Sequence, residues 1–217
     1  RAQIAEHLTQ AARAIGMPFS SNRLTTGRPE DYVSLPLCLA YCAMCMIDET
    51  IAEAYLRRMR ECVYAEGRSL SSIDAQVELA AEFPVDVGQF CDNLESGAAI
   101  PVLQEGVDEC KTHNVTAFPT LLIRYGEHQV AMRGYFDYTA LKQTIAQLTG
   151  GEISLSDAEF SNALEAYINR FGKAAAREIQ TMFSLNDAQL ANVMMDLIST
   201  GRYKTDSCGS SYFVMRK

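Results

Sequence analysis

A proline that precedes a β-rich run constrains the fold of this chain more than any other feature. Residues 114–120 read Asn-Val-Thr-Ala-Phe-Pro-Thr, and an apolar run follows at residues 121–123. Because proline has no backbone N–H to donate, Pro119 belongs at the first residue of a strand or on a sheet edge. We therefore predict a strand that begins directly after Pro119.

The residues that follow this strand predict a hairpin and a helix. Gly126-Glu127-His128 separates the strand from a second extended run at residues 129–133, which is typical of a β-hairpin with a short glycine-containing loop. Residues 138–148 then place Leu141, Ile145 and Leu148 on one helical face. Loop, proline, strand, hairpin, strand and helix follow one another in the second half of a thioredoxin fold.

Residues 114–120 also resemble the "gv-x-g-x-P-t" segment of DsbA-like proteins, in particular their cytoplasmic FrnE-like branch. The resemblance implies that Pro119 is cis and lies at the catalytic site, facing a Cys-x-x-Cys pair. It also implies that Ala117 and Phe118 bind the substrate, with the Phe118 backbone pairing with the substrate chain. The alternative is that Pro119 only begins an edge strand.

The beginning of the chain extends this resemblance. A helix is expected over residues 2–15, and it ends at the turn Gly-Met-Pro-Phe of residues 16–19. In the FrnE-like branch such a turn follows the β-α-β unit that carries the Cys-x-x-Cys pair. Residue 1 is Arg rather than Met, so we expect that the natural N-terminus is missing and that the catalytic cysteines are not in this sequence.

Helical segments are predicted between this turn and the proline loop. Ser34 and Pro36 open a run at residues 37–66 that contains no Gly or Pro, which predicts one uninterrupted helix. A capping box of Ser71 and Asp74 should begin the next helix. The expected limits of the later helices are residues 73–83, 87–94 and 98–112. By the resemblance, residues 34–113 form the helical insertion of an α/β, thioredoxin-like (DsbA-type) domain at residues 1–150.

A second domain is predicted at residues 152–217, after Gly150-Gly151. Its elements are a helix capped by Ser156 with Glu159, a helix at 174–183 and a helix capped by Asn186 with Gln189. Two short strands at 202–204 and 211–215 should follow. This order resembles a small α+β winged helix.

The charge of this second domain argues against DNA binding. It carries seven Lys or Arg and eight Asp or Glu, a net charge of −1, and the whole chain has a net charge of −8. The predicted groove-facing helix at residues 187–196 has no basic residue, although phosphate contacts dominate DNA affinity. We therefore expect a protein contact or a homodimer interface that uses apolar residues such as Met195 or Phe213.

Three cysteines are spaced C-x3-C-x2-C at Cys38, Cys42 and Cys45. This spacing occurs in iron–sulfur sites, and Cys42-Ala-Met-Cys45 is also a C-x-x-C of the redox type. However, offsets of four and seven place the three thiols on one face of a helix among apolar residues. We therefore predict mostly buried thiols on one continuous helix, and neither a metal nor a cofactor.

The remaining composition excludes several classes of protein. The seven cysteines do not have the spacing of a disulfide framework. This favours a reducing compartment, so we expect a cytoplasmic protein. The sequence contains no run of about 18 apolar residues, so we predict no transmembrane helix. His7, His113 and His128 lie far apart in sequence, without the spacing of metal ligands.

The resemblance implies a thiol–disulfide oxidoreductase or isomerase that acts on protein or small-molecule disulfides. The alternative is a non-catalytic thioredoxin-like adaptor that presents partner proteins to other machinery. A C-x-x-C upstream of Arg1 would favour the enzyme, and its absence would favour the adaptor.

Overall fold

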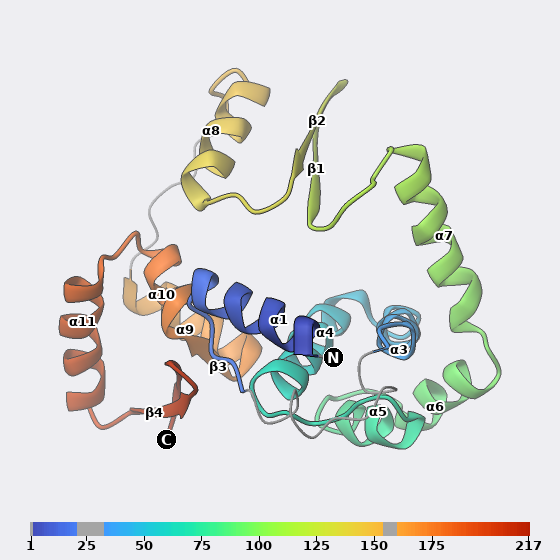
Figure 1. The fold of residues 1–217 in the computed structure, drawn as a ribbon, viewed down its shortest axis with the longest axis horizontal. Coiled ribbons are helices and arrows are strands. Elements are labelled where there is room, and N and C mark those ends of the chain that lie inside the picture. Colours follow the sequence, from blue (N-terminus) through green and yellow to red (C-terminus); the bar gives the residue numbers. More distant parts are fainter. Residues whose placement is uncertain (1, 21–32, 154–159) are drawn as a thin grey trace. The chain divides into compact units, whose positions relative to one another are not determined.

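The computed structural model describes residues 2–20, 33–153 and 160–217 (Figure 1). The chain divides into two compact units. The first contains Arg1–Leu103 together with Phe160–Lys217, and the second contains Gln104–Glu159. None of the helices in the described ranges is long and apolar enough to cross a membrane.

The N-terminal part of the first unit is helical. Its elements are α1 (Ala2–Ile15), α3 (Leu35–Cys45), α4 (Glu49–Tyr64), α5 (Ile73–Ala80), α6 (Val87–Glu95) and the start of α7 (Ala99–Thr112). The core of this part surrounds Tyr55, whose buried ring meets Phe83 and Phe90 edge to face, at centroid distances of 5.8 and 5.5 Å. These contacts join α4 to α6 and to the residues after α5.

The predicted uninterrupted helix at residues 37–66 is wrong, because α3 ends at Cys45 and α4 begins at Glu49. The Asp48 carboxylate accepts hydrogen bonds from the backbone amides of Thr50 (2.8 Å) and Ile51 (3.0 Å). An aspartate that caps a new helix can divide a helical run without Gly or Pro.

Two further capping predictions need correction. Ser72, rather than Ser71, caps α5 and accepts a hydrogen bond from the Ala75 amide at 3.3 Å. Ser34 occupies the N-cap position of α3, but its side chain makes no capping hydrogen bond. Helix α5 also ends at Ala80, three residues before the predicted limit of 83.

The C-terminal part of the first unit combines helices with a small sheet. Its order is α9 (Phe160–Phe171), β3 (Lys173–Ala175), α10 (Ala176–Met182), α11 (Asp187–Ser199), β4 (Tyr203–Cys208) and β5 (Ser211–Arg216). The three strands form an antiparallel sheet in the order β3-β5-β4. The predicted helix start at residue 174 is wrong, because residues 173–175 form β3. The predicted cap at Ser156 and Glu159 lies outside the described residues.

The capping box of α11 is confirmed, since Asn186 and Gln189 exchange hydrogen bonds of 2.9 Å. A second core joins α9, α10, α11 and the sheet through Leu164, Ile168, Ile179, Leu190, Met194 and Val214. Phe213 is 3% exposed and Met195 is 64% exposed. Of the two apolar residues named as contact candidates, only Met195 therefore reaches solvent.

The turn between β4 and β5 packs closely against the segment that follows α1. Gly209 has a φ of +61°, and a Cβ atom there would lie 2.3 Å from the Phe19 carbonyl oxygen. This approach leaves no room for a side chain, so glycine is required. The Cys208 thiol also donates a hydrogen bond to the Ala65 carbonyl at 3.3 Å.

The second unit contains the rest of α7, a hairpin and a helix. Strands β1 (Thr120–Tyr125) and β2 (His128–Arg133) are antiparallel, with Thr120 opposite Arg133 and Tyr125 opposite His128. Helix α8 (Tyr138–Leu148) begins where the Asp137 carboxylate accepts a hydrogen bond from the Ala140 amide at 2.8 Å. The predicted hairpin and the predicted helix at 138–148 are confirmed.

Candidate functional site

The proline loop joins the end of α7 to β1 in the second unit. The Phe118–Pro119 peptide bond is cis, as the resemblance implied. The Thr120 hydroxyl donates a hydrogen bond to the Ala117 carbonyl at 2.7 Å, and the Gly134 amide donates one to the Pro119 carbonyl at 2.9 Å. Two hydrogen bonds therefore hold the loop, one to β1 and one to the residue after β2.

Phe118 is the most accessible part of this loop. Its side chain is 80% exposed, and Ala117 and Pro119 are also exposed. Neither the amide nor the carbonyl of Phe118 forms a hydrogen bond with any residue that the structure describes. The loop thus offers an unpaired backbone donor and acceptor beside a large apolar ring.

An arginine ties the C-terminal end of α7 to the hairpin. The Arg124 guanidinium contacts His113 Nε2 at 2.6 Å, lies 3.7 Å from Glu109 Oε1 and donates to Gln129 Oε1 at 2.9 Å. Since arginine has only donors, His113 Nε2 accepts in this pair. His113 therefore contributes to the support of the proline loop.

The exposed edge of β1 is a further property of this unit. Within residues 104–153, β1 pairs with β2 and with no other strand. Because β1 is paired on one side only, its other edge has unpaired backbone groups directly after the proline loop. A two-stranded sheet is also only marginally stable by itself.

The three cysteines of α3 do not share one environment. Cys42 is buried, Cys45 is partly buried and Cys38 is exposed, so the prediction of mostly buried thiols is wrong for Cys38. Burial raises the pKa of the Cys42 thiol, and the neighbouring Cys45 and Cys38 raise it further. No group of three His, Cys, Asp or Glu in residues 2–20, 33–153 and 160–217 is placed to hold a metal ion.

Cys45 has a raised thiol pKa as well. Burial is the main cause, partly offset by a hydrogen bond with the Tyr41 hydroxyl. Burial and that same hydrogen bond raise the pKa of Tyr41 to about 12. A nucleophilic cysteine needs a lowered pKa, so the C-x-x-C of α3 lacks the electrostatics of a catalytic pair.

Alkylation should separate these thiols by rate. At pH 7 we expect iodoacetamide to modify exposed Cys38 first and Cys42 slowly, since only the thiolate reacts. Cys62 should react last, because burial raises its pKa to about 11. Mass spectrometry of the modified peptides measures the order, and equal rates at Cys38 and Cys42 would contradict it.

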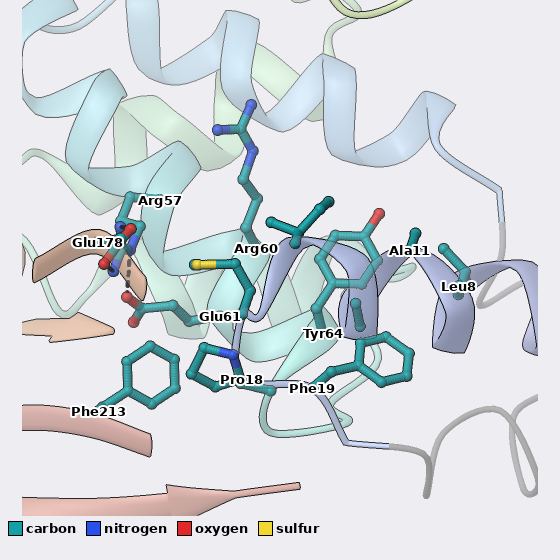
Figure 2. Close-up of a pocket in the computed structure, with 14 residues that line it drawn as sticks. Leu8, Ala11, Pro18, Phe19, Arg57, Arg60, Glu61, Tyr64, Glu178 and Phe213 are labelled. Carbon is teal, nitrogen blue, oxygen red and sulfur yellow. Dashed lines mark hydrogen bonds and ion pairs between the residues drawn. The ribbon is translucent and has the colours of Figure 1, made fainter. Parts of the chain in front are cut away.

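A buried group of charges connects α4 with α9 and α10 inside the first unit. Arg57 donates to Glu61 at 2.5 Å, to the Tyr167 hydroxyl at 2.8 Å and to both carboxylate oxygens of Glu178. Figure 2 shows Arg57, Glu61 and Glu178 pointing toward one another beside a cavity of about 340 Å³. Burial alone would lower the pKa of Arg57, but the two carboxylates raise it overall.

Lysine and arginine side chains extend this group. Lys173 Nζ lies 3.3 Å from both Glu61 and Glu66, and Arg58 pairs with Glu66 and Glu82 at 2.6 and 2.8 Å. The Glu61 Oε2 atom is buried and accepts no hydrogen bond, but two cations lie near it, Lys173 at 3.3 Å and Arg58 at 4.0 Å. The two parts of the first unit are therefore joined by a charge network.

The charge network should make the free energy of unfolding depend on pH. Burial alone would raise the pKa of Glu66, but Arg58 and Lys173 lower it overall from its usual 4.5. A carboxyl whose pKa is lower in the folded than in the unfolded protein stabilises the fold at any pH above its unfolded-state pKa. This stabilisation is lost as the pH falls through the folded-state pKa. Glu66→Gln should therefore make the free energy of unfolding decrease less steeply as the pH falls below 4.5. Urea unfolding at a series of pH values measures this dependence. The exposed Glu105→Gln is the control, and equal slopes in the two variants would refute the assignment.

Sequence reasoning missed this network. Arg57 and Glu178 are 121 residues apart, and no local pattern pairs them. It also missed Tyr135, which is 76% exposed directly after Gly134. A large aromatic residue next to the glycine that ends the hairpin was the available signal.

Comparisons with known proteins agree with this geometry. A family model described as Thioredoxin matches residues 6–143. The chain is 23% identical over 146 residues to the ClpXP adapter protein SpxH of Bacillus subtilis (strain 168), an alignment that covers 66% of this chain and 48% of that protein. The chain therefore spans about half the length of this relative.

A solved structure shows the same fold. The structure is described as a "putative protein disulfide isomerase" from Nitrosomonas europaea, and it matches with a TM-score of 0.62 at 20% sequence identity. The match covers 70% of this chain and 75% of that one. The α/β, thioredoxin-like fold predicted from the proline loop is thus confirmed.

Proposed function

Because this chain belongs to the thioredoxin family, we propose that its proline loop is the substrate-contacting half of a DsbA-type (FrnE-like) thiol–disulfide exchange site. The observation that carries the proposal is Phe118, which is 80% exposed with unpaired backbone groups beside cis-Pro119. An extended substrate segment pairs with those groups as an added strand would.

Exchange at this loop requires a reactive cysteine that lies beside cis-Pro119. Its thiolate attacks one sulfur of a substrate disulfide, a mixed disulfide forms, and the second substrate sulfur leaves as a thiolate. A neighbouring cysteine then attacks the mixed disulfide and releases the reduced substrate. Residues 117–120 of this chain hold the substrate backbone while these sulfurs react. Seven cysteines without a disulfide suit this chemistry in a cytoplasmic setting.

The test is an exchange assay with the full-length protein. We expect it to reduce a protein disulfide, and we expect Thr120→Val to slow this reduction about fivefold. That variant removes the hydrogen bond to Ala117, and one such bond is worth about 1 kcal/mol. The matched control is Thr144→Val, which removes a similar 2.8 Å bond to Ala140 on α8. A wild-type protein without exchange activity would overturn the proposal.

A non-catalytic adaptor is the second candidate function. Its support is the similarity to a protein named as a ClpXP adapter, SpxH. In an adaptor the same loop holds a partner polypeptide but transfers no disulfide. A full-length protein that binds polypeptides and lacks a C-x-x-C upstream of Arg1 would favour this function.

The C-terminal residues serve protein contacts in this proposal. Their order of helix, strand, two helices and hairpin supports a winged-helix-like domain. The groove-facing helix α11 carries Asp187 and Asp196 and no basic residue, while Met195 is 64% exposed. Met195 is therefore suited to a protein partner or a second copy of the chain.

This assignment predicts weak DNA binding. Arg202 and Lys204 are exposed near the start of β4 and could each meet one phosphate. Each phosphate contact contributes about −0.9 to the slope of log binding constant against log salt concentration. Two contacts therefore give only weak non-specific binding at physiological salt. A gel-shift titration is the measurement, and sub-micromolar binding to a specific duplex would show that the charge argument is wrong.

A further inference from the structure

We infer that Phe118, Arg133 and Tyr135 form one recognition surface, the loop-corner surface, that selects polypeptide segments carrying a large apolar residue next to an acidic residue. The inference rests on the proposed function and names the substrate class of the same site. It concerns side-chain selection, which the pairing of the Phe118 backbone does not supply.

The three residues meet at one end of the hairpin. Thr120 of β1 lies opposite Arg133 of β2, and the Gly134 amide donates to the Pro119 carbonyl at 2.9 Å. Phe118 lies one residue before this hydrogen bond and Tyr135 one residue after it. The two aromatic residues therefore flank a single backbone hydrogen bond.

Both rings are unusually exposed. Phe118 is 80% and Tyr135 is 76% exposed, the two largest values among the large hydrophobic residues of the described ranges. One exposed apolar side chain needs no explanation, but a pair at one corner marks an interaction site. Aromatic residues are also enriched among the residues that dominate binding energy. The rings thus supply the apolar selectivity.

The charge of the corner supplies the second half of the specificity. The Arg133 side chain is exposed, and its guanidinium makes no hydrogen bond or ion pair with any described residue. Glu127 is the only acidic residue in the sequence between 114 and 136. It occupies the opposite end of the six-residue strands, roughly 20 Å away at about 3.3 Å per residue.

The next acidic residue in the sequence also forms no ion pair with Arg133. It is Asp137, whose carboxylate accepts the Ala140 amide at 2.8 Å and caps α8. The loop-corner surface is therefore apolar with one free positive charge. Its complement is an aromatic or aliphatic side chain beside Asp or Glu.

The test measures peptide binding to the full-length protein by fluorescence anisotropy. The probes are labelled extended peptides that differ only in a central pair: Phe-Asp, Phe-Lys, Ser-Asp or Ser-Lys. We expect Phe-Asp to bind about tenfold more tightly than Phe-Lys or Ser-Asp. Phe118→Ser or Tyr135→Ser should each weaken Phe-Asp binding about tenfold, a larger loss than truncation of most interface residues causes.

Charge reversal gives the sharpest result. Arg133→Glu should turn the preference from Phe-Asp to Phe-Lys, which a merely unfolded variant cannot do. The matched controls are Ile100→Ser, at a position 57% exposed, and Arg13→Glu on α1, because neither residue lies in the second unit. An unchanged preference in Arg133→Glu, or equal binding of the four peptides, would overturn the inference.

A parallel assay separates this inference from the proposed function. Exchange of the wild-type protein with a small non-peptide disulfide reports the thiol chemistry alone. Exchange without peptide selection would refute the loop-corner surface and keep the exchange site. Peptide selection without exchange would refute the thiol chemistry and keep the surface.

Discussion

Replacing Arg57 with methionine should lower the free energy of unfolding of the first unit by about 3–5 kcal/mol, because breaking a buried charge pair leaves its partner uncompensated. The side chains of Arg57, Glu61 and Glu178 are 15%, 4% and 19% exposed, so the two carboxylates would lose their shared guanidinium at a largely buried position. Urea unfolding followed by circular dichroism measures the loss.

A second ion pair between the same two parts of the unit provides the matched control. Arg170 pairs with Glu53, but these side chains are 50% and 61% exposed. Arg170→Met should therefore cost less than about 1 kcal/mol. Adding Glu178→Met to Arg57→Met should recover part of the loss, since it removes one stranded charge. Equal losses in Arg57→Met and Arg170→Met would contradict the network.

Removing the Phe90 ring should destabilise the helical part of the chain by about 3–5 kcal/mol, the usual cost of a Phe→Ala change in a core. Phe90 is fully buried and its ring meets that of Tyr55 at 5.5 Å. Phe90→Ala therefore removes transfer energy, leaves a cavity and breaks an aromatic contact. Denaturant unfolding of the purified variant is the measurement.

Phe118→Ala is the matched control for this prediction. The same side chain is removed, but from a position that is 80% exposed. Its effect on stability should stay within about 0.5 kcal/mol, as for most surface substitutions. A similar loss in both variants would mean that Phe118 is packed in the full-length protein and does not face a substrate.

The sequence predicted best the elements whose limits are set by local chemistry. The limits of α8 and the capping box of α11 follow from short-range patterns, and so does the hairpin after Pro119. The division at Asp48 was missed, although an aspartate before Glu-Thr is itself a capping signal. A carboxylate that caps a new helix divides residues 37–66 even though they contain no Gly or Pro.

Elements that depend on distant residues were harder to predict. Strand β3 consists of Lys173–Ala175, and alanine favours helix, so only its pairing with β5 makes it a strand. Burial of Phe213 likewise follows from the sheet. The Arg57–Glu178 pair depends on the tertiary fold, and no periodicity of either helix indicates it.

The candidate site was predicted in part. The proline loop and its cis bond followed from the resemblance of residues 114–120, and the burial of Cys42 followed from its place on an apolar helix. Tyr135 and Arg133 were not predicted as site residues. Their role depends on the strand register, which brings residues 133–135 beside Pro119.

The most direct test of the central claim is hydrogen exchange of the full-length protein while it holds an unfolded, disulfide-containing polypeptide. We predict slower exchange of the backbone amides at residues 117–118, 120–121 and 133–136, with exchange in α3 unchanged. Slower exchange at Leu35–Cys45, with the proline loop unaffected, would contradict the account and place the site at the cysteine-bearing helix.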